Sequence, residues 1–224
     1  LTTPSLGINT PGITYFEPAF AQEVEWVLLE AVRSIGSGEG GSYLLRLSTK
    51  PIDQKLFPVV SDRLRQGVLS GCYRYLSAPE DSETVMNAFV VGAMVDEAIA
   101  SVELLEREGI GVSLFIVTSP DLLFRRMNTA QAVEQAGTDV GAWDPLELLE
   151  DREIGRPVLC VIDGHPHSMA FLGAALDCPS TVLGVTSYGQ SGSRADLYRH
   201  FGMDARGIFE AGLGLVDRWR KRVF

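Results

Sequence analysis

The chain has few cations, few histidines and no long apolar run. Its 224 residues carry 19 Lys and Arg against 29 Asp and Glu, which gives a formal net charge of -10. An acidic chain with so few cations argues against a nucleic-acid-binding surface and against an anionic membrane as a partner. The longest strongly apolar run, near Val85 to Val95, is too short to span a bilayer.

Cysteine is also scarce. Cys72, Cys160 and Cys178 form no closely spaced pair, which is typical of reduced thiols, and we expect a cytoplasmic protein. No charged-then-apolar leader opens the chain, so we expect no secretory signal. Because the chain begins with Leu1 rather than Met, we expect it to be part of a longer protein.

The first third of the chain predicts one helix and one strand before the pattern becomes irregular. Apolar residues repeat at helical spacing over residues 18–35, with a proline in the first turn and glycines after the last. We expect the acids of this helix, Glu23, Glu25 and Glu30, to lie on its solvated face. A strand is expected over residues 42–48.

From residue 84 onward, apolar strands alternate with helical segments. Continuous apolar strands that alternate with helices predict an α/β fold, with a mostly parallel sheet covered by helices on both faces. The expected strands are Val85–Val91, Val112–Val117, Val158–Ile162 and Val182–Thr186, and the expected helices are Asp96–Arg107, one from Ser119-Pro120, one near Ser168–Leu176, and two that begin at Ser193 and Asp204.

A Gly/Ser-rich loop, Gly189-Gln190-Ser191-Gly192-Ser193, lies between a predicted strand and a predicted helix. It lacks the Gly-Lys-Ser/Thr of a Walker loop, and it does not fit the G-x-S-x-G nucleophile elbow. Backbone N–H groups in such a loop could hold an anion. The alternative is a structural turn in which Ser193, with Asp196, caps the next helix.

The sequence Asp163-Gly164-His165-Pro166-His167 follows the third strand of the predicted sheet. Functional groups in α/β sheets gather at the carboxyl ends of strands. Asp163, His165 and His167 together suggest a metal hydrolase, but the histidines lack the helical H-x-x-x-H spacing and no third ligand cluster is visible. A capped turn or a polar interface patch is the alternative, and we assign no metal ligand.

The stretch from Tyr188 to Ile208, Y-G-Q-S-G-S-R-A-D-L-Y-R-H-F-G-M-D-A-R-G-I, resembles the tail signature of the C-terminal domain of transketolase-like, thiamin-diphosphate-dependent enzymes. Ile13–Val32 and Ser42–Gln54 resemble the end of the pyrimidine-binding domain in the same family. The wording F-E-P-A-F-A-Q-E-V is closest to the homodimeric bacterial pyruvate dehydrogenase decarboxylating component.

This resemblance implies a division of the chain and a set of partners. Residues 1–50 would end a pyrimidine-binding domain, residues 51–83 would form a linker with a short strand over Cys72 to Leu76, and residues 84–224 would form the C-terminal α/β domain. The upstream domains and a second protomer of a homodimer would be its partners. Other subunits of a 2-oxo acid dehydrogenase complex would be further candidates.

The resemblance also implies thiamin diphosphate and Mg²⁺ in the parent enzyme, with neither bound by this chain. In the family that the chain resembles, the metal ligands come from a G-D-G motif and a later Asn. This chain contains no G-D-G. We therefore assign no catalytic residue. Sugar-phosphate transketolases have a sequence similar to L-S-R-Q after this strand, and its Arg binds the substrate phosphate. Here Ser48 is followed by Thr49 and Lys50 instead, which favours a 2-oxo acid over a sugar phosphate.

We expect a part of a decarboxylating subunit that is inactive alone. The alternatives are part of a sugar transketolase, and a stand-alone module that binds an anion or a partner protein. The candidate substrate or anion contacts are Lys50, Gly189, Ser191, Gly192, Ser193 and Arg194, and the candidate interface residues are His165, His167 and Tyr188.

Overall fold

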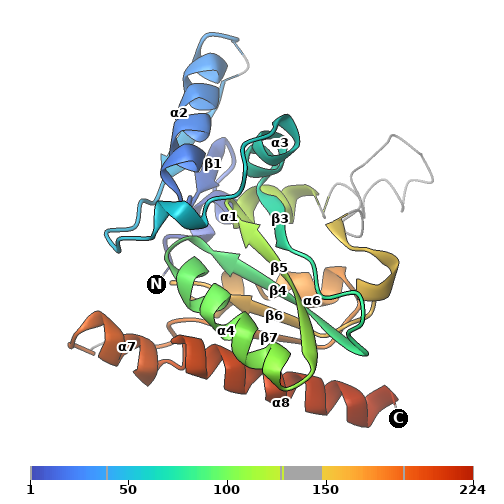
Figure 1. Cartoon of the computed structure of the whole chain (residues 1–224). Coiled ribbons are helices and arrows are strands. Elements are labelled where there is room, and N and C mark those ends of the chain that lie inside the picture. The colour runs from blue at the N-terminus through green and yellow to red at the C-terminus, as the bar shows by residue number, and fades with distance from the viewer. Residues whose placement is uncertain (1, 39, 127, 129–147, 189, 224) are drawn as a thin grey trace.

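Two β-sheets of unequal size organise the chain (Figure 1). The computed structural model describes residues 2–38, 40–126, 128, 148–188 and 190–223. After the short helix α1 (Ser5–Asn9), the parallel strands β1 (Ile13–Phe16) and β2 (Ser42–Leu45) form the small sheet. The helix α2 (Ala21–Ile35) joins these two strands.

The large sheet has five strands in the order β3-β5-β4-β6-β7. Its edge strand β3 is antiparallel to β5, and all the other pairings are parallel, which confirms the predicted α/β class. The bounds are β3 (Cys72–Leu76), β4 (Thr84–Val91), β5 (Ile110–Val117), β6 (Val158–Val161) and β7 (Ser180–Leu183).

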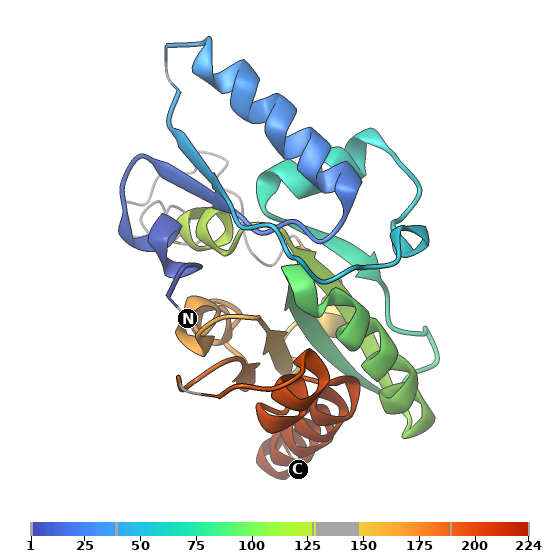
Figure 2. The same cartoon turned by 90° about the vertical axis from the view of Figure 1, so that its left-hand side faces the viewer.

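Helices cover both faces of the large sheet. The longer helices are α3 (Asp62–Ser70), α4 (Val95–Arg107) and α8 (Ala205–Val223); the shorter ones are α6 (Phe171–Ala175), α7 (Arg194–His200) and a helical stretch over residues 120–126. Figure 2 shows α2 and α8 at opposite ends of the molecule. None of the helices in the described ranges is both long and apolar enough to cross a membrane.

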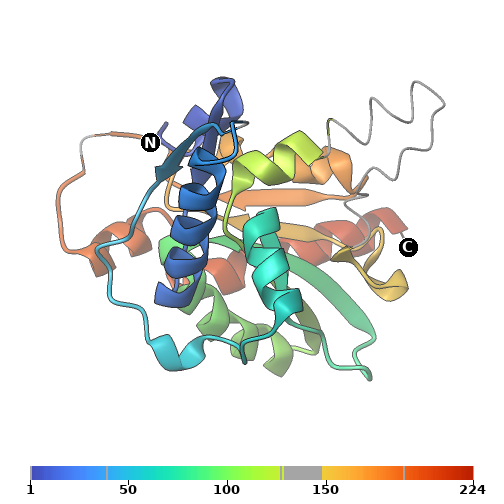
Figure 3. The same ribbon diagram turned by 90° about the horizontal axis from the view of Figure 1, so that it is seen from above.

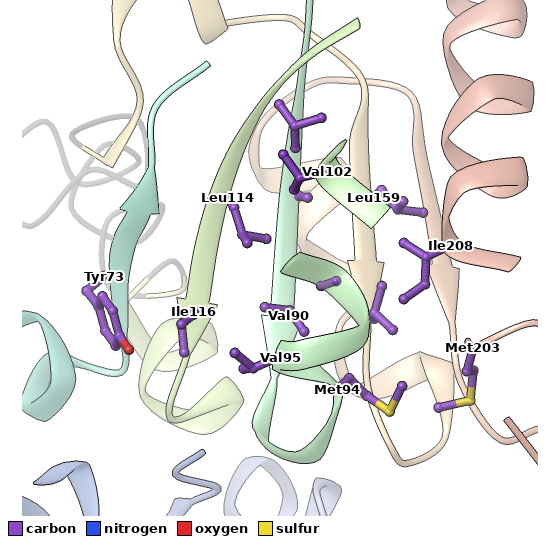
Figure 4. Close-up of a cluster of buried hydrophobic side chains, with 14 of the residues drawn as sticks. Tyr73, Val90, Met94, Val95, Val102, Leu114, Ile116, Leu159, Met203 and Ile208 are labelled. Carbon is purple, nitrogen blue, oxygen red and sulfur yellow. The ribbon is translucent and has the colours of Figure 1, made fainter. Parts of the chain in front are cut away.

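The two faces of the sheet are separated by strict alternation along its strands. In β4, Met86 and Val90 join the cluster under α4 and α8, part of which is drawn in Figure 4, while Phe89 and Val91 join the cluster on the other face. Side chains of a strand point alternately to its two faces, so an uninterrupted apolar strand fills two cores at once. Cys72 and Cys160 are fully enclosed in the second cluster.

The expected strands and helices are present, with shifted ends. The strand predicted over residues 182–186 is Ser180–Leu183, and the helix expected near residues 168–176 is a 3-10 turn at Pro166–Ser168 followed by α6. The short strand expected inside the linker is β3, which pairs with β5 at the sheet edge. The division into domains itself stays a prediction.

The prediction for the start of α2 and for Glu23 was wrong. The helix begins at Ala21, three residues after Pro18, and Glu23 is fully buried. Its Oε2 accepts from the backbone N–H groups of Ala19 (2.6 Å) and Phe20 (2.9 Å), and its Oε1 accepts from the Tyr73 hydroxyl (2.7 Å). An acid at the third helical position can reach back to the N–H group of the residue before the helix, and here this contact and the Tyr73 hydroxyl hold Glu23 inside the protein.

An ion pair fastens β3 to the segment that leads into β6. Arg74 donates from both terminal nitrogens to the Glu153 carboxylate, at 2.7 Å each, and Glu153 is fully buried. Ser113 of β5 also donates to this carboxylate.

Replacing Arg74 should therefore be costly. Arg74→Met leaves an uncompensated buried carboxylate, and we expect the free energy of unfolding to fall by about 3–5 kcal/mol in urea titrations. The matched control is Arg107→Met, whose exposed pairing with Glu103 spans 3.7 Å and should cost less than about 1 kcal/mol. Equal losses in the two variants would contradict the role assigned to the buried pair.

Candidate functional site

A cavity of about 590 Å³ lies where the carboxyl ends of strands from both sheets meet. Ligand sites of α/β proteins form at this edge, and cavities of a few hundred Å³ are typical of small-molecule sites. Figure 3 gives the view of these elements from above. The cavity is lined by Glu17, Arg46 to Lys50, Ala93, Asp163, Val185, Ser187, Tyr188, Gln190, Gly192, Arg194, Leu197, Tyr198 and Phe201.

Three charged side chains meet at one end of this cavity. Arg46 follows β2, and its Nη1 lies 2.6 Å from Oε1 of Glu17, the residue after β1. The same nitrogen donates to the Asp163 carbonyl oxygen (2.6 Å), and Nη2 lies 3.3 Å from the Asp163 carboxylate. Tyr15 donates its hydroxyl to Glu17 Oε2 at 2.5 Å. We call Glu17, Arg46 and Asp163 the arginine cluster.

The backbone at the end of β4 makes room for Glu17. Gly92 has a φ of +51°, and a Cβ there would lie 2.6 Å from Glu17 Cγ. A larger residue would therefore be strained in its own backbone and would collide with the buried acid.

Burial raises the pKa of Glu17 to about 7, against the opposing influence of the Arg46 charge and of the Tyr15 hydrogen bond. Burial also raises the pKa of Tyr15, so its phenol stays a neutral donor to Glu17. A carboxyl group that titrates near neutral pH at the wall of a cavity is typical of functional sites.

Lys50, expected to contact an anion, is already paired. Its Nζ lies 2.5 Å from Asp96 Oδ1 and 3.3 Å from Glu97 Oε1, and it donates to the Ala93 carbonyl oxygen at 3.2 Å. Only 6% of the side chain is exposed. An anion that enters the cavity would therefore meet an ammonium whose charge α4 has neutralised.

The predicted loop residues divide into two groups. Tyr188, Gly192 and Arg194 line the cavity together with Lys50, whereas Ser191 and Ser193 are not among its lining residues. Ser193 instead caps α7, because its Oγ accepts from the Asp196 N–H at 3.2 Å. Gly189 lies outside the residues that the structure describes.

The two predicted histidines lie away from the cavity, beside α1. The Nδ1 atoms of His165 and His167 are 2.6 Å apart, and Nε2 of His167 is 2.5 Å from Ser5 Oγ. Partial burial and the neighbouring His165 lower the pKa of His167. Asp163 pairs with Arg46 instead of joining them, and no group of three or more potential metal ligands occurs within the described ranges.

Sequence reasoning missed Glu17 and Arg46 as members of a site. Each is a single charge beside an apolar strand, at the end of β1 and of β2. That position was the available signal, because the ends of parallel strands meet at one edge.

The comparisons with known proteins agree with the resemblance found in the sequence. The pyruvate dehydrogenase E1 component of Corynebacterium glutamicum is 25% identical over 223 residues, which is 96% of this chain and 24% of that protein. The pyruvate dehydrogenase E1 component of Escherichia coli K12 is 23% identical over 219 residues, 92% of this chain and 23% of that protein. This chain thus spans about a quarter of these relatives. No family model matches.

Solved transketolases share the fold over nearly the whole chain. A transketolase variant from Pichia stipitis has a TM-score of 0.67 at 18% identity and covers 99% of this chain and 28% of its own. A "split gene transketolase, inactive beta4 tetramer" has a TM-score of 0.62 at 15% identity and covers 96% of this chain and 61% of its own.

The chain has a transketolase-like fold. With the weak sequence similarity to pyruvate dehydrogenase E1 components, this is consistent with a transketolase-like C-terminal region.

The raised pKa of Glu17 predicts a pH dependence of stability. Because the fold favours the protonated acid, its contribution is fully present below the ordinary value of 4.5 and is lost as pH rises through about 7. Glu17→Gln keeps an acceptor for Arg46 and lacks the titration. Between about pH 5 and 7, we expect wild type to lose stability relative to this variant by on the order of 1 kcal/mol per pH unit.

Urea unfolding at several pH values measures this difference. Glu25→Gln, on the exposed side of α2, removes the same charge and should follow wild type. Parallel stability curves for Glu17→Gln and wild type would contradict the assignment.

Proposed function

We propose that this chain is the C-terminal part of a thiamin-diphosphate-dependent, transketolase-like enzyme that decarboxylates a pyruvate-like 2-oxo acid. In this role it supplies structure and interfaces and is inactive alone. The name of the relatives, pyruvate dehydrogenase E1 component, supports the substrate class, and the quarter of their length that is matched supports a partial chain.

The observation that carries the proposal is the incomplete small sheet. β2 has β1 as its one strand neighbour in the described part of the chain. The N–H groups of Ser42 and Arg46 point to β1, where they donate to Gly12 and Phe16. In a parallel ladder, the backbone groups of Tyr43 and Leu45 then point to the opposite, open edge. Parallel sheets are normally covered and rarely have two strands, so this edge calls for another polypeptide.

The helix beside this sheet is also left partly uncovered by the described parts of the chain. α2 projects from the body (Figures 1 and 2). Its side chains Leu28, Leu29, Val32 and Ile35 are 49%, 53%, 69% and 72% exposed. An apolar surface of this kind is typical of an interface. The upstream domains of the parent and a second protomer are the partners we propose for it, with other subunits of a dehydrogenase complex as further candidates.

The residues that the structure describes do not fit thiamin diphosphate with Mg²⁺. The two carboxylates of the cavity are both engaged by Arg46, and the described residues hold no cluster of metal-ligating side chains. When bound in the parent, the cofactor would act as an electron sink for the carbanion. We place its binding residues outside this chain, and we place the parent in the cytoplasm as a homodimer.

A sugar transketolase is the second candidate, favoured by the solved structures with the same fold. Thr49 and Lys50 stand where, by resemblance, such enzymes have an Arg that binds the substrate phosphate. Lys50 is ion-paired with Asp96 and Glu97, and this favours the 2-oxo acid. Assays of the full-length parent with pyruvate, 2-oxobutyrate and xylulose phosphate would distinguish the two.

We predict that the isolated chain neither binds thiamin diphosphate with Mg²⁺ nor decarboxylates pyruvate. Isothermal titration calorimetry and a decarboxylation assay measure these two properties. A dissociation constant of about 1–10 μM for the cofactor, which corresponds to a binding free energy of about −7 to −8 kcal/mol, would refute the proposal.

Substitutions on α2 test the interface. We expect Val32→Gln with Ile35→Gln to leave the fold intact and to weaken assembly with the upstream polypeptide by about tenfold or more, since two exposed apolar side chains are lost from the contact. Val59→Gln, 91% exposed but off this helix, is the matched control. Analytical ultracentrifugation of mixtures gives the affinities, and unchanged assembly in the α2 variant would contradict an interface there.

A further inference from the structure

Among the residues that the structure describes, one cation of the cavity has no counter-charge. Of its three cationic side chains, Arg46 is paired with Glu17 and Asp163, and Lys50 with Asp96 and Glu97. Arg194, which begins α7, forms no ion pair with any residue that the structure describes. It is exposed to solvent and lines the cavity.

A hydroxyl donor lies one helical turn beyond this cation. Arg194 and Tyr198 are four residues apart on α7, which places them on the same face of the helix. Tyr198 lines the cavity, and its ring is fixed under the Lys50 ammonium, with 5.0 Å from Nζ to the ring centroid. Within the described ranges, the Tyr198 hydroxyl has no hydrogen-bond partner. Burial raises the pKa of this phenol, with Asp163 acting in the same direction, so it stays protonated and able to donate.

The wall around these two polar groups is apolar. Leu197 comes from α7 and Phe201 directly follows this helix, Leu47 comes from the segment after β2, and Val185 comes from the segment after β7. Leu47 is 56% exposed although it is large and apolar. A ligand that covers Leu47 would remove this side chain from water.

We propose that this cavity binds a small monocarboxylate with an apolar body. The carboxylate pairs with Arg194 and accepts from the Tyr198 hydroxyl, and the apolar body lies against Leu47, Leu197 and Phe201. A single unmatched cation suits a single negative charge. The further charges of a phosphate ester or a diphosphate would face the two carboxylates of the arginine cluster.

This site is independent of the function proposed above, because it requires neither thiamin diphosphate nor another polypeptide. It assigns a ligand site to the contact between the small sheet and the C-terminal end of the chain. The contact is built from residues after β2 and on α7.

Phenylacetate is a suitable probe because it combines one carboxylate with an apolar ring. We expect calorimetry or ligand-observed NMR to detect binding to the 224-residue chain, with phenylacetamide, the neutral isostere, bound about tenfold more weakly or worse. Inorganic phosphate should not displace phenylacetate at equal concentration.

Variants assign the contacts. Arg194→Gln should weaken phenylacetate binding by about tenfold or more, because a charge-assisted hydrogen bond is lost, and Tyr198→Phe should weaken it by about threefold to tenfold. The control is Arg199→Gln, on the same helix but outside the cavity lining, which should stay within about twofold of wild type. Thermal melting verifies that each variant is folded; Arg194 is exposed, so its replacement should not disturb the fold.

Three outcomes would overturn the proposal. The first is equal affinity for the acid and the amide, and the second is unchanged affinity in folded Arg194→Gln. The third is no detectable binding at about 10 mM phenylacetate, because binding weaker than this, about −3 kcal/mol, would not be specific. None of them bears on cofactor binding by the parent, so failure here leaves the proposed function standing.

Discussion

The Arg46 guanidinium is the contact on which the arrangement of the two sheets depends. It is the meeting point of groups that end three different strands: Glu17 after β1, Arg46 itself after β2, and Asp163 after β6. Lys50, further along the segment after β2, makes a second contact of this kind, because it pairs with Asp96 and Glu97 in the first turn of α4. Glu17 and Lys50 are buried, and buried charges are tolerated only when they are paired, so these contacts favour one relative placement of the small and the large sheet.

This placement explains why the cavity lies at the sheet junction and what kind of surface it presents. The arginine cluster occupies its polar end with charges that are already paired, and α7 supplies part of the apolar wall and the exposed cation. Among the described residues, no comparable contact covers the opposite side of the small sheet. There the β2 edge has no further strand neighbour in these residues, and apolar side chains of α2 are exposed.

The sequence predicted the parts of the fold that arise from local patterns. Continuous apolar runs identified β4, β5 and β6, because strands buried on both faces leave no polar alternation. Glu23 was misjudged because its buried partner, Tyr73, is 50 residues away along the chain. The pairing of Arg46 with Asp163 could not be predicted either, because the two residues are 117 positions apart and come together only in the folded chain. The loop near Arg194 was identified as a candidate from its composition, but its pairing with a cavity required the tertiary structure.

The enclosure of Cys72 and Cys160 has a practical consequence. Both side chains are buried, and burial raises the pKa of both thiols. The thiolate is the reactive form of cysteine, so these two sulfurs should be poor targets for maleimides and peroxides while the fold is intact. Cys178 is only half-buried, so a variant without Cys178 would let a cysteine introduced on the surface accept a fluorophore selectively while Cys72 and Cys160 stay in place.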